Sequence, residues 1–137
     1  MNILLLAVDS NLYGIDQHCV LRVIDPRREE VIEEPAERRA SYRGESFRLV
    51  DVRRDLEQAL TPREADRPSA YLLVGSSGDG SGERYLLSVD EARSIIHLGG
   101  EQVYPIPPYI FEEMTDCFRG VFEYRGRLQL LINEQRL

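Results

Sequence analysis

A tripeptide that occurs twice, Tyr-Arg-Gly, constrains the possible fold of this chain more than any other feature. Its copies, residues 42–44 and 124–126, lie 82 positions apart (124 − 42), and each precedes an apolar stretch typical of a β-strand. Upstream of each copy is a second echo, since residues 12–16 are answered by residues 84–88 at an offset of 72 (85 − 13, tyrosine to tyrosine). Because the echoes keep the same order, we predict two related halves arranged about a pseudo-twofold axis.

Short apolar segments separated by turn residues recur along the whole chain of 137 residues. Strands are predicted at residues 3–8, 12–16, 20–24, 47–52, 71–74, 85–89, 94–98, 118–124 and 127–132. A single short helix is predicted at residues 53–60, because Val52, Leu56 and Leu60 fall on one helical face. Many short strands with little helix are typical of small barrels or a sandwich.

Polar and proline-rich stretches divide these segments. Residues 27–39 are dense in Arg and Glu, and we interpret them as a solvated loop or an edge strand. Residues 61–69 carry two prolines and form the predicted connection between the halves. Residues 104–109 are too proline-rich for a central strand and are expected to be extended at the surface. Gly14, inside a predicted strand, indicates a bulge or a close approach of the backbone to another group.

Net charge and cysteine content argue against several classes of protein. The formal net charge of −7 disfavours a nucleic-acid-binding surface and disfavours binding to an anionic membrane. The longest apolar run, residues 3–8, is far too short to span a membrane, and it lacks the basic flank of a signal peptide. Cys19 and Cys117 have no paired spacing, and we interpret them as free thiols in a reducing cytoplasm.

The residues that most resemble catalytic or ligand-binding groups each have a simpler structural interpretation. The glycine-rich residues 75–82 lack the Lys-Ser/Thr pair of a phosphate-binding loop, so we interpret them as a hairpin loop. His18 and His97 lack metal-ligand spacing, and Asp51 is expected to cap the following helix or to pair with an arginine. Adjacent glutamates, including residues 29–30, are interpreted as solvated runs. We therefore expect no catalytic, cofactor-binding or metal-binding residue.

The order of motifs resembles that of the CheW-like coupling domains of bacterial chemotaxis systems. The resemblance spans residues 3–137 and gains its specificity from short strings that keep the family's order over one chain. The strings are residues 13–24 (the opening strands), residues 41–52 (the family's N-L-R-G-x-x-x-P-V-V-D-L stretch), residues 88–96 (its V-D-E-V segment), and residues 118–121 with 127–132 (its closing I-R-G-V … L-L-D hairpin).

The resemblance implies a mostly β fold of two intertwined five-stranded SH3-like β-barrels related by a pseudo-twofold, with a few short helices. A single domain, residues 1–137, would contain subdomain 1 at roughly 12–68 and subdomain 2 at roughly 69–132. The terminal segments, residues 1–11 and 133–137, are candidates for crossing between the barrels. Family members are not enzymes. They bridge a chemoreceptor's cytoplasmic tip and the regulatory domain of a histidine kinase, through barrel surfaces and the groove between the halves.

Departures from the family's motif concentrate at positions that face a partner in the family. Ser41 stands where the family has asparagine, Arg48 where it has proline, and Arg38 where it has glycine. Arg22 replaces a usual acidic residue, and this reversal of sign changes which partner surface is attracted. The candidate partner-binding residues are Arg22, Arg38, Ser41, Arg43, Gly44 and Arg48.

Arg43 and Arg125 precede the turn glycines of the two echoes. Gly44 and Gly126 are expected to take positive φ, which glycine adopts at little cost. Arg43 is either an exposed turn residue or, as the family resemblance implies, a residue that fixes nearby loops of the partner-binding surface through several hydrogen bonds. For Arg125, only the internal echo suggests a role.

These observations favour a cytoplasmic, non-enzymatic adaptor that couples chemoreceptor-like proteins to a histidine kinase. The alternative is a divergent CheW-like module that binds a different signalling partner or a small ligand, because Arg22, Arg38 and Arg48 alter the family's interface pattern. An enzyme has little support, and would need a deep pocket that contains converging carboxylates or His18.

Overall fold

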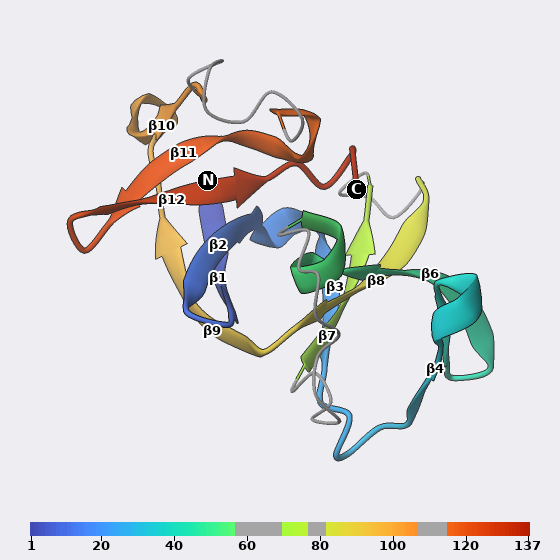
Figure 1. Ribbon diagram of the computed structural model, residues 1–137. Helices are drawn as coiled ribbons and strands as arrows, with labels where there is room; N and C mark the ends of the chain where they lie inside the picture. Colours follow the sequence, from blue (N-terminus) through green and yellow to red (C-terminus); the bar gives the residue numbers. More distant parts are fainter. Residues whose placement is uncertain (57–69, 77–81, 107–114) are drawn as a thin grey trace.

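The computed structural model describes residues 1–56, 70–76, 82–106 and 115–137, which form two curled six-stranded β-sheets (Figure 1). Sheet A has the strand order β10-β11-β12-β2-β1-β9, and sheet B has the order β3-β7-β8-β6-β5-β4. The strands of sheet A are β1 (Asn2–Val8), β2 (Asn11–Asp16), β9 (Glu91–His97), β10 (Val103–Tyr104), β11 (Phe118–Tyr124) and β12 (Arg127–Ile132). The strands of sheet B are β3 (Val20–Ile24), β4 (Val31–Glu34), β5 (Arg39–Tyr42), β6 (Glu45–Asp51), β7 (Ala70–Gly75) and β8 (Arg84–Val89). The short helices are η1 (Gln17–Cys19), η2 (Pro35–Glu37), η3 (Val52–Leu56), η4 (Gly100–Gln102) and η5 (Thr115–Cys117).

Strands from distant parts of the chain are exchanged between the sheets. Strand β2 leads through η1 into β3 of sheet B, and β8 leads through Asp90 into β9 of sheet A. Sheet A therefore combines the first two strands with the last four, and the predicted mostly β, intertwined fold with a few short helices is confirmed. Each sheet holds six strands rather than the expected five. Three of the twelve described strands, β4, β5 and β10, were not predicted from the apolar runs; they are short and form in charged or proline-rich stretches, where the apolar pattern is weak.

The two sheets correspond strand by strand, in the order β10/β4, β11/β5, β12/β6, β2/β8, β1/β7 and β9/β3. The only parallel pairings among the described strands lie at equivalent places: Leu130 faces Tyr13 in sheet A, and Arg48 faces Tyr85 in sheet B. Leu130 thus corresponds to Arg48, an offset of 82 (130 − 48), and Tyr85 to Tyr13, an offset of 72 (85 − 13), as in the sequence echoes. Edge strands β9 and β3 also shift register with their neighbours at equivalent positions. The sequence echoes therefore report a true structural repeat.

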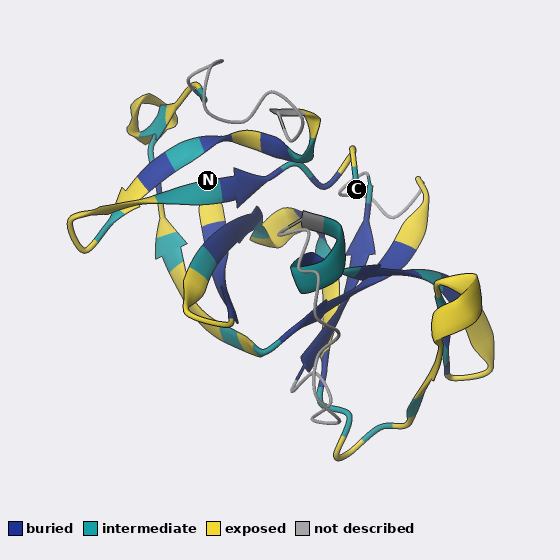
Figure 2. Ribbon diagram, in the orientation of Figure 1, coloured by how far each residue is buried: buried dark blue, intermediate teal, exposed yellow. Residues whose placement is uncertain are grey.

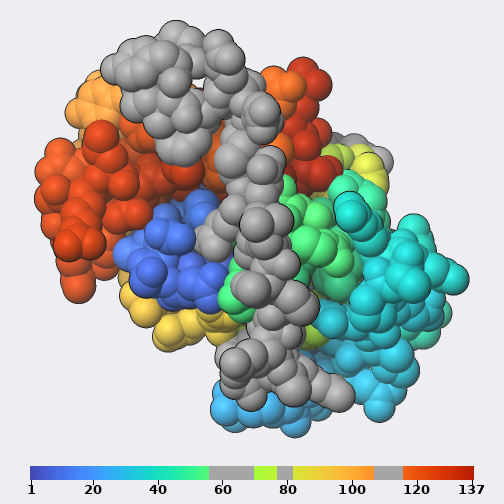
Figure 3. All heavy atoms as spheres, in the orientation of Figure 1, coloured from blue at the N-terminus to red at the C-terminus, as the bar shows by residue number. Residues whose placement is uncertain are grey.

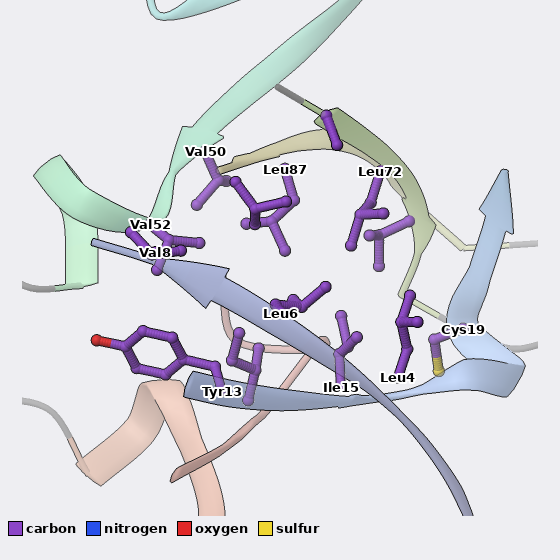
Figure 4. Packing of buried hydrophobic residues seen from close by; sticks show 14 of the residues in the cluster. Leu4, Leu6, Val8, Tyr13, Ile15, Cys19, Val50, Val52, Leu72 and Leu87 are labelled. Atoms are coloured by element: carbon purple, nitrogen blue, oxygen red, sulfur yellow. The ribbon is translucent and has the colours of Figure 1, made fainter. Parts of the chain in front are cut away.

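Apolar side chains from both sheets meet in a shared core (Figure 4). Leu4 of β1 packs there with Leu72 of β7 and Leu87 of β8, and none is more than 6% exposed. The other face of β1 packs through Ile3 and Leu5 into a separate core within sheet A. Because both faces of β1 are covered, its sequence is a continuous apolar run rather than an alternating one. Burial is concentrated in the central strands, whereas the β4–β5 region is largely exposed (Figure 2).

The inner cores of the two sheets differ by an exchange of side-chain size at equivalent positions. Sheet A has Gly14 and Phe122 where sheet B has Leu86 and Ala40. A Cβ atom on Gly14 would lie 2.6 Å from Cγ2 of Ile3 and 2.8 Å from the Phe122 ring. Only glycine therefore leaves room for the phenylalanine, and the predicted close approach at Gly14 is confirmed.

Candidate partner-binding surface

The hairpin between β5 and β6 turns on two residues, Arg43 and Gly44, whose φ angles are +51° and +78°. Arg125 and Gly126 repeat the same two angles in the hairpin between β11 and β12. Positive φ at both central positions is the signature of the type I′ turn, whose twist matches that of the flanking strands. The expected positive φ of both glycines is confirmed, and the left-handed backbone of each arginine was not expected.

The side chain of Arg43 belongs to a group that we name the Glu29 cluster: Arg22, Glu29, Tyr42 and Arg43. Oε1 of Glu29 accepts a hydrogen bond from Nη2 of Arg43 at 2.6 Å and one from Nη2 of Arg22 at 3.2 Å. The hydroxyl of Tyr42 donates to the same carboxylate at 3.1 Å, and the Arg43 guanidinium lies 5.3 Å from the Tyr42 ring centroid. The connection between β3 and β4 is therefore tied to the β5–β6 hairpin.

The charges of the Glu29 cluster stabilise one another. The hydrogen bond from Arg43 holds the pKa of the Glu29 carboxyl below its usual value, and Tyr42 and Arg22 add to this effect. The same hydrogen bond raises the pKa of Arg43. Two guanidinium groups against one carboxylate leave net positive charge, and 44% of the Arg22 side chain and 58% of the Arg43 side chain remain exposed. The cluster is thus an accessible, positively charged feature on an acidic chain.

Arg48, on β6, ties together three segments of the chain. Its Nε donates to Glu83 at 2.9 Å, and its Nη2 donates to the main-chain oxygen of Leu137 at 2.6 Å. The guanidinium also lies 5.0 Å from the ring centroid of Tyr85. Arg48 therefore joins β6 to β8 and to residues 133–137, and this structural role accompanies any part it has in binding.

Arg38 follows η2 with a left-handed backbone, at a φ of +53°. The glycine that the family has here fits this conformation freely, whereas a residue with a Cβ costs roughly 1–2 kcal/mol. Nη1 of Arg38 lies 3.8 Å from Oδ1 of Asp55. Both residues line a pocket of about 220 Å³ together with Arg48, Leu49 and Leu137, among others.

The six predicted residues fall into two groups rather than one site. Three belong to the β5–β6 turn and the Glu29 cluster, whereas Arg38 and Arg48 line the pocket. Ser41 lies on β5 between the two groups, opposite Ile32 of β4, and it is partly exposed. The structure thus brings Arg22 and Arg43 together through a shared carboxylate.

Apolar side chains are exposed on both edge strands of sheet B. Leu21 and Val23 of β3 are 40% and 50% exposed and flank Arg22 in sequence, and Ile32 of β4 is 53% exposed. Edge strands have unpaired backbone groups, and exposed apolar side chains on them are typical of docking elements. The segment that follows β3, through β4 and β5, forms one flank of the molecule in the space-filling view, coloured light blue to cyan (Figure 3).

The carboxylates of this surface were not found by sequence reasoning. Glu29, interpreted as part of a solvated run, is the shared acceptor of three side chains. No local pattern in the sequence indicated this role, because Arg22, Glu29 and Arg43 are brought together only by the fold. For Asp51 the interpretation is confirmed, since its Oδ1 accepts a hydrogen bond from the backbone N–H of Arg53 at 3.0 Å.

The remaining predicted features have structural roles or lie outside the described residues. Cys19 and Cys117 are free thiols, and Nδ1 of His97 lies 3.0 Å from Oδ1 of Asn2. Among the described residues, no group of three or more His, Cys, Asp or Glu side chains is arranged to hold a metal ion. None of the described helices has the length and apolar character needed to cross a membrane. Most of the glycine-rich loop, the predicted inter-half connection and residues 57–60 of the predicted helix lie outside the described ranges.

The strand exchange and the duplicated order of strands define a class of intertwined double-sheet β proteins, and comparison with known proteins identifies the family. A family model, the CheW-like domain, matches residues 2–137. The chain therefore belongs to the CheW-like domain family. A similar fold is found in the crystal structure of the scaffolding protein TtCheW from Thermoanaerobacter tengcongensis, with a TM-score of 0.73 and 18% sequence identity over 96% of this chain and 87% of that chain. A search of curated proteins found no match.

Proposed function

We propose that this chain is a non-enzymatic, cytoplasmic adaptor that couples chemoreceptor-like proteins to a histidine kinase. The observation that carries the proposal is the CheW-like match over residues 2–137, and the likeness to a scaffolding protein supports it. The partners would be the regulatory domain of the kinase and the cytoplasmic tip of a receptor. The role at the level of the family is that of a chemotaxis adaptor.

The surface of sheet B has the chemistry that such docking needs. Exposed Leu21, Val23 and Ile32 provide apolar area, and the Glu29 cluster adds Tyr and Arg side chains, which are enriched at the energetic centres of interfaces. Because Glu29 already holds the guanidinium of Arg43 in place, less side-chain entropy is lost when a partner binds. The cluster would act as a preorganised polar anchor for a partner that also contacts these apolar side chains.

Reconstitution with purified partners tests the proposal. The chain should sediment with the kinase regulatory domain and a receptor-tip fragment as one complex, and should bridge the two when they do not bind each other. Arg43→Ala should weaken binding by roughly tenfold, since it removes a charge-assisted hydrogen bond and leaves Glu29 less well paired. Arg27→Ala is the matched control because Arg27 is exposed and pairs with Asp25 outside the cluster. Equal effects of the two variants would contradict the assigned role of the cluster.

A second candidate function is binding of a different signalling protein or of a small ligand. The observation that favours it is Arg22, which puts a second guanidinium where the family has an acidic residue. A partner surface with a basic group at this place would be repelled, so partner choice would shift. Pull-down from the source cell separates the two candidates, because an array component recovers receptors and kinase together.

A further inference from the structure

The hairpin between β11 and β12 borders an open groove on sheet A. The groove has a volume of about 620 Å³ and lies between this hairpin, the turn that joins β1 to β2, and strand β9. In Figure 1 the hairpin projects from the body of the protein, with β9 and the β1–β2 turn beside it. Its lining includes Arg93, Arg125 and Arg127 and a single acidic residue, Glu91, so its local charge is positive on a chain with a net charge of −7.

Three residues that line the groove have larger counterparts at the equivalent places in sheet B. The sheet B residues are Arg22 in place of Ser94, Arg84 in place of Leu12, and Phe47 in place of Gln129. There, the guanidinium of Arg84 lies 5.6 Å from the ring centroid of Phe47 and 3.1 Å from Oε1 of Glu45. Sheet A has neither this stacked pair nor the carboxylate, since Glu45 corresponds to Arg127.

The turn arginines of the two sheets differ in how their charge is balanced. In sheet B, Glu29 neutralises the turn arginine from within the chain. In sheet A, the guanidinium of Arg125 lies 5.1 Å from the ring centroid of Tyr124, as that of Arg43 lies over Tyr42. Arg125 nevertheless forms no ion pair with any described residue. Arg127 likewise has no carboxylate partner in the described ranges. Glu101, the counterpart of Glu29 at an offset of 72, does not pair with Arg125.

We infer that this groove binds an acidic, extended segment of a partner protein. A carboxylate of the segment takes against Arg125 the place that Glu29 takes against Arg43 in sheet B, and Arg127 adds a second positive charge beside it. Leu12 and the 67%-exposed Leu128 provide apolar contacts beside the charges. The groove carries more positive charge than it can balance internally, which gives it charge complementarity to such a segment. The inference goes beyond the proposed coupling function, because it concerns sheet A and holds whichever protein supplies the segment.

A peptide with the sequence of residues 29–34, Glu-Glu-Val-Ile-Glu-Glu, is a suitable probe because it contains the internal carboxylate of Glu29, and its last four residues form strand β4 in the protein. The peptide is capped at both ends and labelled, and binding to the intact chain is measured by fluorescence anisotropy at low salt. A second peptide has glutamine in place of all four glutamates. The acidic peptide should bind at least about tenfold more tightly than the glutamine peptide, and added salt should weaken its binding.

Two double variants locate the binding site. Arg125→Glu/Arg127→Glu should weaken binding of the acidic peptide by about tenfold or more, whereas Arg27→Glu/Arg28→Glu, a matched change at two exposed arginines that pair with Asp25, should leave it unchanged. Circular dichroism confirms that each variant is folded. Absence of binding at millimolar peptide, equal binding of the glutamine peptide, or equal loss in both variants would overturn the inference. Self-association that only the groove variant abolishes would also overturn it, because the occupant would then be a second copy of the chain.

Discussion

An exchange of side-chain size between Gly14 and Phe122 tests the structural repeat on which the fold rests. Gly14→Leu alone would place a Cβ within 2.6 Å of Ile3 and further atoms against a ring that is fully buried, and such overpacking destabilises by about 1–3 kcal/mol. Phe122→Ala alone removes a fully buried phenyl ring, which costs about 3–5 kcal/mol. Both losses are measurable in a domain whose total stability is about 5–15 kcal/mol.

The double variant Gly14→Leu/Phe122→Ala reproduces the pair that sheet B already has, Leu86 and Ala40. The leucine occupies space that the phenyl ring vacates, so the contacts with the ring are relieved, and only the contact with the end of the Ile3 side chain still has to be accommodated. We therefore predict that the double variant is more stable than Phe122→Ala. Its loss should be smaller than the sum of the single losses by more than the Gly14→Leu loss of about 1–3 kcal/mol, and residues in contact show coupling of about 0.5–3 kcal/mol.

Urea unfolding followed by far-ultraviolet circular dichroism provides the four free energies of this cycle, since the chain contains no tryptophan for fluorescence. The reverse exchange in sheet B, Leu86→Gly with Ala40→Phe, is the matched control and should show coupling of the same sign. Strictly additive losses in both sheets would refute the reasoning, because the two positions would then not share one packing site.

Three further predictions concern single residues. Glu29→Gln should reduce the loss of folding stability that acid causes. The folded-state pKa of Glu29 lies below the ordinary value of 4.5. The ionised carboxylate therefore stabilises the folded state above that pH, and this stabilisation is lost as pH falls through the folded-state pKa. Urea midpoints of the two proteins at neutral and acid pH check this, and parallel pH profiles would contradict it. Arg38→Gly should leave the free energy of unfolding unchanged or raise it by up to about 1 kcal/mol. The change relieves a left-handed backbone and loses only an exposed ion pair with Asp55. A decrease of more than about 1 kcal/mol in urea unfolding would contradict the account. Cys19 should react with iodoacetamide at pH 8 far more slowly than Cys117. Burial and the nearby Glu134 raise the pKa of the Cys19 thiol to about 12, and the residue is only 5% exposed. Equal rates of modification of the two thiols in the folded protein, measured by mass spectrometry, would be inconsistent with this burial.

Much of the fold follows from local patterns in the sequence. The apolar runs predict most strands within one or two residues, and the repeated Tyr-Arg-Gly predicts both turns, because a two-residue hairpin needs glycine at a positive φ. The close approach at Gly14 was also predictable, since glycine weakens the interior of a strand and is typical of places where a side chain would not fit. Strands β4 and β5 were not predicted as a pair, because their charged side chains face solvent and hide the alternation.

The candidate site was less predictable because it depends on contacts between residues far apart in the chain. Arg43 was found from the motif, whereas its partner Glu29 lies 14 residues away in a run that looks solvated. The link from Arg48 to Leu137 spans 89 residues and is created by the packing of β6, a contact that no local pattern encodes. The size exchange between Gly14 and Phe122 becomes visible only when the two sheets are compared position by position.

The central proposal is that the duplicated framework presents its outer faces to signalling proteins. Isothermal titration of the intact chain with the kinase regulatory domain from the same genome tests this most directly. The account predicts saturable binding of one chain to one regulatory domain, weakened by Arg43→Ala and unaffected by Arg27→Ala. No binding at tens of micromolar to that domain, or to the receptor tip in a parallel titration, would contradict it.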